Sequence, residues 1–424
     1  MNIVDIINKK VVKEVLSYDE IKNAVDGYLD GSVKDYQMSS LLMAILLNGM
    51  NEEEIYSLTD IMINSGETID LSSIEGNVVD KHSTGGIGDK TTLVLAPLLA
   101  ACGCKIAKMS GRGLGYTGGT IDKLESIEGF KVTMDFDTFI NQVNEIGVAI
   151  VGQMGNLVPA DKKVYSLRDV TGTVASIPLI ASSIMSKKIA SGANKIIIDV
   201  KVGNGALMKD IESARELANT MIKIGKKYNR EVVCFITEMD TPLGNAVGNS
   251  LEVIEAINTL KGKGPKDLTE LVITLSAHLI SMDKNISLEE ATKLATDKLK
   301  DGSAYNKFIE LVNAQQGDIN NIKVSNRVFS IKSNKTGFIK KIDALKIGTI
   351  AHKIGAGRTN KEDTIDYTVG IVLSKKVGDY VMENEEIACV YLNKIDLGIN
   401  EILECFEITD IVGELSPLIK EIVR

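Results

Sequence analysis

The pattern of hydrophobic and polar positions changes along the chain. The first 65 residues have a helical pattern, and capping-box spacing marks two helix starts, at Ser17 with Glu20 and at Asn51 with Glu54. From Val78 onward, short β-branched runs are each followed by a glycine loop and a helix. This alternation predicts a mainly parallel sheet that helices cover on both faces. The expected strands are residues 78–79, 105–109, 148–152, 195–200 and 231–237.

Two further segments interrupt this alternation. Between residues 160 and 190 the strand pattern stops, and two helical stretches appear that we expect to pack with the N-terminal helices. From Val324 onward, short strand-like runs and turns replace amphipathic helices. We therefore predict an α/β protein with a small all-helical domain, a large α/β domain with a mainly parallel mixed sheet, and a β-rich C-terminal α+β unit. The predicted boundaries are 1–68 and 159–191 for the helical domain, 69–158 and 192–325 for the α/β domain, and 326–424 for the C-terminal unit.

Composition narrows the classes of function. The chain has 48 Lys and Arg against 57 Asp and Glu, a net charge of −9, which argues against nucleic acid as a partner because phosphate backbones need a clustered basic face. No apolar run approaches the roughly 18 to 20 residues of a membrane helix, so no membrane partner is expected. Five cysteines in 424 residues are too few for a disulfide framework, which favours a reducing compartment, the cytoplasm.

Glycine and positive charge concentrate in one segment. Residues 81–122 contain nine of the 37 glycines, and five Lys or Arg against two Asp. Two loops, 81–90 and 110–120, each follow an expected strand and precede an expected helix. Because parallel strands end at the same edge of a sheet, the amides, hydroxyls and helix N-termini of both loops should surround one crevice. Such a crevice suits a small anion such as phosphate.

Two familiar nucleotide motifs fit this segment poorly. A P-loop that ends at Lys90 would need glycine where the chain has Thr84 and Asp89, so an ATPase is disfavoured. Residues 113–118 match G-x-G-x-x-G, and Asp135 lies at a tolerable distance for a ribose-binding acid. The neighbouring glycines and threonines suit a wider anion loop better than a pyrophosphate turn, so a dehydrogenase is disfavoured as well.

Both loops carry longer motifs. Residues 81–86 read KHSTGG, and residues 110–125 read SGRGLGYTGGTIDKLE. Together they resemble the thymidine and pyrimidine-nucleoside phosphorylase family, and the resemblance extends over essentially the whole chain in element order. It implies a homodimer in which a helical and an α/β domain close over the substrate, and in which inorganic phosphate cleaves a pyrimidine nucleoside. It also implies phosphate contacts from Lys81, Ser83, Thr92, Lys108, Ser110 and Thr120.

The inserted helical stretches contain two pairs with helical spacing. Tyr165 and Arg168 are three residues apart, and Ser183 and Lys187 are four apart, so each pair lies on one helical face. The spacing alone also fits solvated side chains, whereas the resemblance implies a pyrimidine site with Arg168 and Lys187 on the ring carbonyls. The predicted catalytic residues are these two and His82, the only one of the three histidines that lies in a glycine loop. His82 would donate a proton or hydrogen bond to the 2-carbonyl, with a pKa near the working pH, or would only shape the loop.

The resemblance also bears on the substrate. The reaction would convert uridine, thymidine and deoxyuridine reversibly to free base and (deoxy)ribose 1-phosphate. The branch restricted to thymidine and deoxyuridine has Met where this chain has Lys108, which favours the broader branch; Tyr116 stands where members usually have His. Two alternatives stay open: an anthranilate-phosphoribosyltransferase-like glycosyltransferase, and a nucleoside-binding sensor that has lost turnover.

The resemblance implies no organic cofactor, but the resemblance to the broader branch implies a bound potassium ion. Threonine is usual at position 90, and the ammonium of Lys90 would repel a bound cation beside it. A second expectation is therefore that Lys90 pairs with Glu255 and replaces the ion. The ligands of potassium would stand at Gly88, Lys90, Leu243, Ala246 and Glu255.

Overall fold

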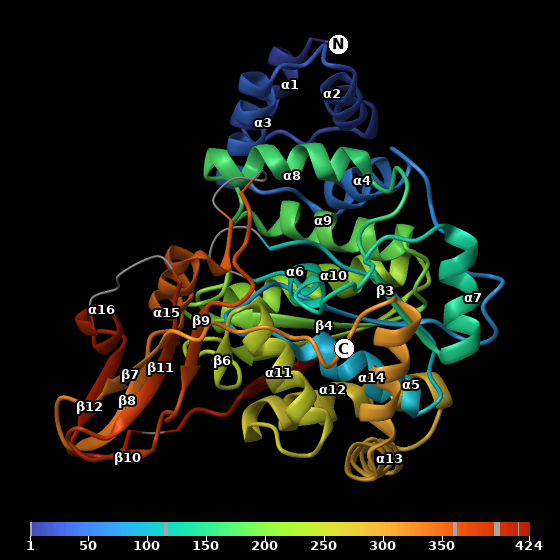
Figure 1. Cartoon of the computed structure of the whole chain (residues 1–424). Helices are drawn as coiled ribbons and strands as arrows, with labels where there is room; N and C mark the ends of the chain where they lie inside the picture. Colours follow the sequence, from blue (N-terminus) through green and yellow to red (C-terminus); the bar gives the residue numbers. More distant parts are fainter. Residues whose placement is uncertain (1, 114–117, 359–362, 394–398, 414) are drawn as a thin grey trace.

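Helices from two separate stretches of sequence form the domain at the top of Figure 1. The computed structural model describes residues 2–113, 118–358, 363–393, 399–413 and 415–424. The helices of this domain are α1 (Ile3–Val11), α2 (Tyr18–Asp30), α3 (Asp35–Asn48), α4 (Glu52–Ile63), α8 (Pro159–Thr171) and α9 (Ile177–Ala190). Both predicted capping boxes are confirmed, at the starts of α2 and α4. As expected, the inserted helices pack on the N-terminal ones, α8 on α2 and α3, and α9 on α4.

The second domain is built on two groups of parallel strands. One group contains β1 (Val79–Ser83), β4 (Lys195–Val202) and β5 (Glu231–Glu238), and the other contains β2 (Ile106–Met109) and β3 (Val148–Val151). A bridge between Val78 and Lys105 joins β1 to β2. The carboxyl ends of these two strands therefore lie at the same edge of the sheet, where the two glycine loops begin.

Helices cover both faces of this sheet (Figure 1). Alternate residues of β4 face opposite sides, so Ile196 and Ile198 pack with α9 and α10, while Ile197 packs with α5 and α12. This alternation of two apolar faces explains why β4 and β5 are buried along almost their whole length. The covering helices are α5 (Thr91–Ala101), α6 (Thr120–Glu125), α7 (Phe136–Ile146), α10 (Ile211–Lys227), α11 (Asn249–Leu260), α12 (Lys266–Lys284), α13 (Leu288–Lys300) and α14 (Ser303–Ala314).

The C-terminal unit is rich in antiparallel strands. Its strands form one sheet of order β10-β8-β12 and a second of order β6-β9-β11-β7. β6 (Ala246–Val247) comes from the α/β domain, so its pairing with β9 fastens the two parts together. The other elements are β7 (Val328–Lys332), β8 (Gly337–Ile342), α15 (Ala344–Ala351), the π-helical turn η1 (His352–Ala356), β9 (Gly370–Leu373), β10 (Tyr380–Val381), β11 (Glu386–Tyr391), α16 (Ile399–Leu403) and β12 (Phe406–Thr409).

The predicted fold class is confirmed: a helical domain, an α/β domain with a mainly parallel mixed sheet, and a β-rich C-terminal unit. One strand was not foreseen. β13 (Ile419–Val423) leaves the C-terminal unit and pairs antiparallel with β5, so the last residues complete the sheet of the α/β domain. The numerical domain boundaries remain predictions. No helix in the described part of the chain is long and apolar enough to cross a membrane.

Candidate active site

The first glycine loop begins at the carboxyl end of β1. Lys81 is buried there, with Nζ 3.5 Å from Oδ2 of Asp89 and 3.8 Å from Oδ2 of Asp199. Ser83 closes the strand, and its Oγ accepts a hydrogen bond from the backbone N–H of Gly85 at 3.3 Å. The loop then leads into α5, so its amides and the N-terminus of that helix stand close to Lys81.

Lys108 on β2 reaches across to the first loop. Its Nζ lies 2.9 Å from Oδ1 of Asp80 and 2.6 Å from the carbonyl oxygen of Lys81. The other carboxylate oxygen of Asp80 accepts from Nζ of Lys188, on α9, at 2.6 Å. Two buried ammonium groups thus share one carboxylate, which leaves a surplus of positive charge next to Lys81.

The pKa values of Asp80 and Lys108 show that positive charge exceeds negative charge in this cluster. Burial opposes the charge on Asp80, but Lys108 and Lys188 outweigh it and lower the pKa of Asp80 to about 2. Burial also lowers the pKa of Lys108 to about 7, and the charge of Lys188 adds to this while Asp80 acts against it. A bound anion would restore the balance by favouring the charged lysine.

The second glycine loop lies next to the first. Ser110 directly follows β2, and its backbone N–H donates to the carbonyl of Val151. Thr92 lies in the first turn of α5, and Thr120 is the first residue of α6. A Cβ on Gly119 would lie 2.1 Å from the backbone nitrogen of Gly113, so the close approach of these two residues requires glycine at position 119. The predicted departure at Tyr116 lies outside the described residues.

The four residues of the predicted base site lie together on α8 and α9. Nζ of Lys187 is 2.6 Å from Oδ2 of Asp161, 3.0 Å from Oγ of Ser183 and 5.5 Å from the centre of the Tyr165 ring. The guanidinium carbon of Arg168 is 5.7 Å from the same ring centre. The two spaced pairs therefore face each other across the helices, with Lys187 one-third exposed.

The guanidinium of Arg168 makes several hydrogen bonds to the backbone, which the spacing of the residues did not predict. Its side chain is buried, and its guanidinium donates to the carbonyl oxygens of Thr173, Val174 and Leu179 at 3.3, 2.8 and 3.1 Å. These carbonyls belong to the turn between α8 and α9 and to the first turn of α9. Arg168 therefore holds this turn in place, and only the remaining N–H groups of its five can reach a ligand.

His82 lies where the phosphate half and the base half meet. Burial, followed by the charges of Lys188, Lys108 and Lys187, lowers the pKa of His82 well below its ordinary value. The sequence predicted a pKa near the working pH, and this was wrong because it took no account of burial, the largest cause of the shift, or of the three neighbouring lysines. His82 is neutral at pH 7 and can donate a hydrogen bond, but it carries no charge there.

Sequence reasoning missed the carboxylates and one lysine of the site. Asp80 and Asp161 are the partners of Lys108 and Lys187, and Lys188, which none of the motifs singles out, is only 4% exposed. One signal was present. Asp80 interrupts an otherwise apolar start of a buried strand, and a buried carboxylate needs a cationic partner.

The five residues of the implied potassium site also come together. Nζ of Lys90 donates to the carbonyl oxygens of Leu243 and Ala246 and to Oε2 of Glu255 at 2.9, 2.8 and 2.5 Å, and the Gly88 carbonyl accepts from the Lys90 backbone N–H at 2.9 Å. Three of the implied ligands are thus bound to an ammonium group. The residues present do not fit a metal ion at this position.

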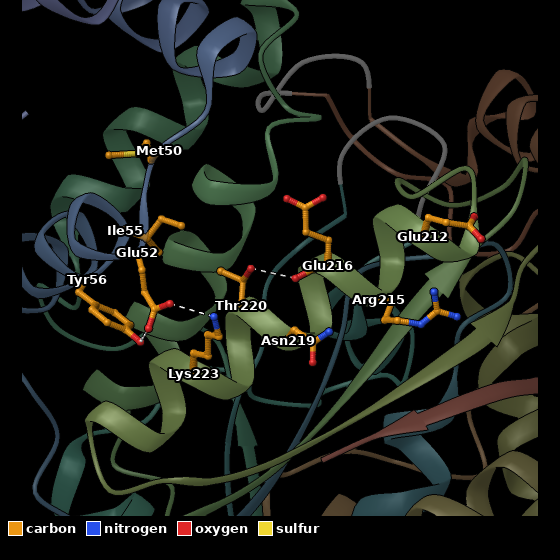
Figure 2. Close-up of a pocket in the computed structure, with 10 residues that line it drawn as sticks. All are labelled: Met50, Glu52, Ile55, Tyr56, Glu212, Arg215, Glu216, Asn219, Thr220 and Lys223. Carbon is orange, nitrogen blue, oxygen red and sulfur yellow. Dashed lines mark hydrogen bonds and ion pairs between the residues drawn. The ribbon is translucent and has the colours of Figure 1, made fainter. Parts of the chain in front are cut away.

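Among the described residues no group of three or more His, Cys, Asp or Glu side chains could hold a metal ion. A cavity of about 500 Å³ between α4 and α10 is lined by charged and apolar side chains such as Tyr56, Arg215 and Lys223 (Figure 2), but it contains none of the residues predicted for phosphate or base. The residues predicted for phosphate and base thus lie outside this cavity.

Family models match all three parts of the chain. The model of the "Glycosyl transferase family, a/b domain" matches residues 75–305, and that of the family's helical bundle domain matches residues 4–66. The "Pyrimidine nucleoside phosphorylase C-terminal domain" matches residues 338–408. The fold also resembles a solved structure of anthranilate phosphoribosyltransferase from Thermus thermophilus, with a TM-score of 0.59 and 19% identity, over 74% of this chain and 100% of that one. That likeness shows the fold alone.

Curated relatives match along nearly the whole chain. A pyrimidine-nucleoside phosphorylase of Staphylococcus haemolyticus is 52% identical over 417 residues, 96% of each chain. The protein of the same name from Staphylococcus epidermidis is 54% identical over 93% of this chain and 92% of its own, and that from Geobacillus stearothermophilus is 52% identical over 93% of each. Together with the match of its C-terminal unit, these identities show that the chain belongs to the pyrimidine-nucleoside phosphorylase family.

Proposed function

We propose that the protein catalyses the reversible phosphorolysis of pyrimidine nucleosides, giving free base and (deoxy)ribose 1-phosphate. The observation that carries the proposal is the carboxylate of Asp80, which accepts from Lys108 of the phosphate half at 2.9 Å and from Lys188, the neighbour of Lys187 in the base half, at 2.6 Å. A surplus of cations on the phosphate side thus faces a partly exposed ammonium on the base side. The names of the relatives support the same reaction.

The phosphate half would hold the nucleophile. Four buried lysines of this half are paired with only three carboxylates, so a bound phosphate would meet the remaining positive charge. The lysines are Lys81, Lys108, Lys188 and Lys201, and the carboxylates are Asp80, Asp89 and Asp199. The hydroxyls that follow the strands or begin the helices, together with loop amides, would orient the phosphate oxygens. The proposed phosphate contacts are Lys81, Ser83, Thr92, Lys108, Ser110 and Thr120.

The base half would stabilise the leaving group. A phosphate oxygen attacks C1′ of the sugar, the bond from C1′ to N1 breaks, and its electron pair moves onto the pyrimidine. Lys187 and the free N–H groups of Arg168 would point at the ring carbonyls, where this negative charge collects. They bind the departing anion more tightly than the neutral substrate, which is what lowers the barrier. Tyr165 and Ser183 would position the ring.

His82 would act as a neutral donor. Its lowered pKa favours the neutral imidazole at pH 7, which can donate a hydrogen bond to the 2-carbonyl as the negative charge develops there. A neutral imidazole also adds no further positive charge to a site that already holds three lysines. We therefore assign it to hydrogen bonding rather than to proton transfer.

We further propose that ribonucleosides and deoxyribonucleosides are both substrates. This rests on Lys108, which stands where the thymidine-restricted branch has Met. Absorbance assays with uridine, thymidine and inosine in parallel test the breadth. Uridine and thymidine should be cleaved only when phosphate is present, with one sugar 1-phosphate formed per base released, and inosine should not be cleaved.

The same assay distinguishes the alternatives. Consumption of phosphoribosyl pyrophosphate, with no phosphate-dependent cleavage of nucleosides, would indicate a phosphoribosyltransferase and overturn the proposal. Binding of uridine without release of uracil in a single turnover would indicate a sensor. Ribose 1-phosphate absent from the uridine reaction, but deoxyribose 1-phosphate formed from thymidine, would restrict the substrate to deoxyribonucleosides.

We propose that the working form is a homodimer that associates through its helical domain. Large apolar side chains are exposed on α1, α3 and α8, among them Leu47 at 74% and Val170 at 80%. Exposed large apolar side chains on helices that contact one another are typical of an interface. Light scattering should give twice the chain mass, and Leu47→Glu should shift it toward the single chain. The exposed set is Val4, Val11, Val12, Val15, Tyr36, Met43, Leu47 and Val170.

We also propose that the protein works in the cytoplasm. All five cysteines are free thiols, and four of them are buried. Burial raises the pKa of Cys102 and of Cys405 to about 12, which keeps both as unreactive thiols. Free, inert thiols suit a reducing compartment. Cell fractionation should recover the activity with cytoplasmic markers.

A further inference from the structure

The ammonium of Lys90 is enclosed by oxygen atoms. The side chain is completely buried, and its Nζ donates all three hydrogens: to the carbonyls of Leu243 and Ala246 and to the carboxylate of Glu255, at 2.9, 2.8 and 2.5 Å. A lysine has three donors and no acceptor, so this site satisfies it completely.

Glu255 is held in place from its other side. It lies on α11, and its carboxylate accepts hydrogen bonds from the backbone N–H groups of Asn245 and Ala246, between 2.9 and 3.2 Å. Burial alone would lower the pKa of Lys90, but the charge of Glu255, followed by that of Glu252, raises it above its ordinary value. The ammonium is therefore charged at every physiological pH.

Two glycines make room for this arrangement. A Cβ on Gly244 would lie 2.3 Å from Oε2 of Glu255 and 3.0 Å from Nζ of Lys90. A Cβ on Gly88 would lie 2.7 Å from the carbonyl oxygen of Leu243. Both glycines have positive φ, so the backbone itself is shaped around the cation. These close contacts leave no space for a second cation beside the ammonium.

We propose that the ammonium of Lys90 is a tethered cation that permanently takes the place of a potassium ion, so that the protein folds and works without any monovalent metal. The tether joins three parts of the chain: the start of α5, the segment around β6, and α11. Because β6 pairs with β9 of the C-terminal unit, the contacts of Lys90 also hold that unit next to the loop that leads to Thr92. A metal ion can join these parts of the chain only while it is bound, whereas Lys90 joins them whatever salt is present.

Thermal unfolding of the unaltered protein tests this directly and needs no substrate. The midpoint should be the same in potassium, sodium and tetramethylammonium chloride at equal ionic strength. A midpoint that rises with potassium in a saturable manner, and not with sodium, would overturn the proposal. The result does not depend on which nucleoside the enzyme cleaves, so the proposed function can fail without affecting it.

A pair of variants tests the same junction from the other side. Lys90→Thr removes the ammonium and supplies a hydroxyl, so its midpoint in tetramethylammonium should fall by roughly 5 °C or more and should recover as potassium is added. Lys90→Met is the matched control, since it removes the charge but fills the space, and potassium should not restore it. Equal responses of the two variants to potassium, or no response of Lys90→Thr, would contradict the proposal.

Discussion

Two buried lysines near the same loop have opposite electrostatic surroundings. Lys90 and Lys108 are 1% and 4% exposed, so both have lost their contact with water. Lys90 has a carboxylate of its own and two carbonyls, and its pKa is raised. Lys108 shares Asp80 with Lys188, and its pKa is lowered to about 7.

The difference teaches that the number of acceptors, and not burial, decides what a buried lysine does. Where acceptors match donors, the charge is satisfied internally and stabilises the fold. Where cations outnumber carboxylates, charge is left over for a ligand, and the site stays unbalanced until an anion binds. We therefore assign Lys90 to structure and Lys108, with Lys81, to the substrate.

Removal of Lys81 should have the largest effect on activity. Lys81→Met takes away a charge that stands at the start of the first glycine loop, and we expect kcat/KM for phosphate to fall by about 10³-fold. Phosphate-dependent release of uracil measures this. Lys223→Met, which breaks only the exposed pair with Glu52, is the control and should stay close to the unaltered protein. Comparable losses in both variants would mean that Lys81 has no special role.

On the base side, Lys187→Met should lower kcat by about 10²-fold, because one stabilising donor to the leaving base is lost. KM for phosphate should change little, since the phosphate half remains intact. Steady-state kinetics with uridine and phosphate varied separately give both constants. A rise of KM for phosphate with an unchanged kcat would mean that Lys187 binds phosphate and not the base.

The lowered pKa of Lys108 predicts a pH dependence for anion binding. As pH rises through about 7 the ammonium loses its proton, so the affinity for sulfate, whose own charge is constant, should fall about tenfold between pH 6 and pH 8. Calorimetric titration measures it, and Lys108→Met should flatten the curve. A curve of equal steepness in the variant would show that another group titrates.

The same shift affects stability in a defined direction. Because the pKa of Lys108 is about 7 in the folded chain and 10.5 ordinarily, the unfolded chain binds more protons between these values. This lysine therefore raises the free energy of unfolding as pH increases from 7 to 10.5. Lys108→Met should remove that part of the pH dependence in denaturant titrations.

The smallest effect is expected at His82. A neutral hydrogen-bond donor is all that the site requires, so His82→Gln should keep activity within about tenfold, whereas His82→Phe should lose more. Near pH 6.5, the pH profile of kcat/KM should be the same in the unaltered protein and in His82→Gln, with no step that only the unaltered protein shows. Such a step would mean that His82 gains a proton during the reaction.

The sequence predicted the parts of the molecule that depend on local pattern. The helices that flank residues 69–158, the glycine loops and the parallel strands all follow from short-range periodicity and capping, as at Ser17 and Asn51. The strand β13 was missed because its partner β5 is far away in sequence, and no local signal distinguishes a strand of one sheet from a strand of another.

The candidate site was predicted only as far as its motifs reach. The residue types around the two loops were found, but the balance of charge was not, because Asp80 and Lys188 come from β1 and α9 and meet only in the folded chain. The same applies to Arg168, whose burial depends on the turn after α8. Spacing shows which face of a helix a residue occupies, and packing decides what covers that face.

One diffraction experiment tests the contrast between the two lysines most directly. Crystals grown with selenate and rubidium chloride would reveal both ions by their anomalous scattering. We predict selenate bound by Lys81 and Lys108, between the two glycine loops, and no rubidium beside the carboxylate of Glu255. Rubidium among the oxygens around Lys90, or a crevice without selenate, would contradict the assignment of one lysine to the fold and the other to the substrate.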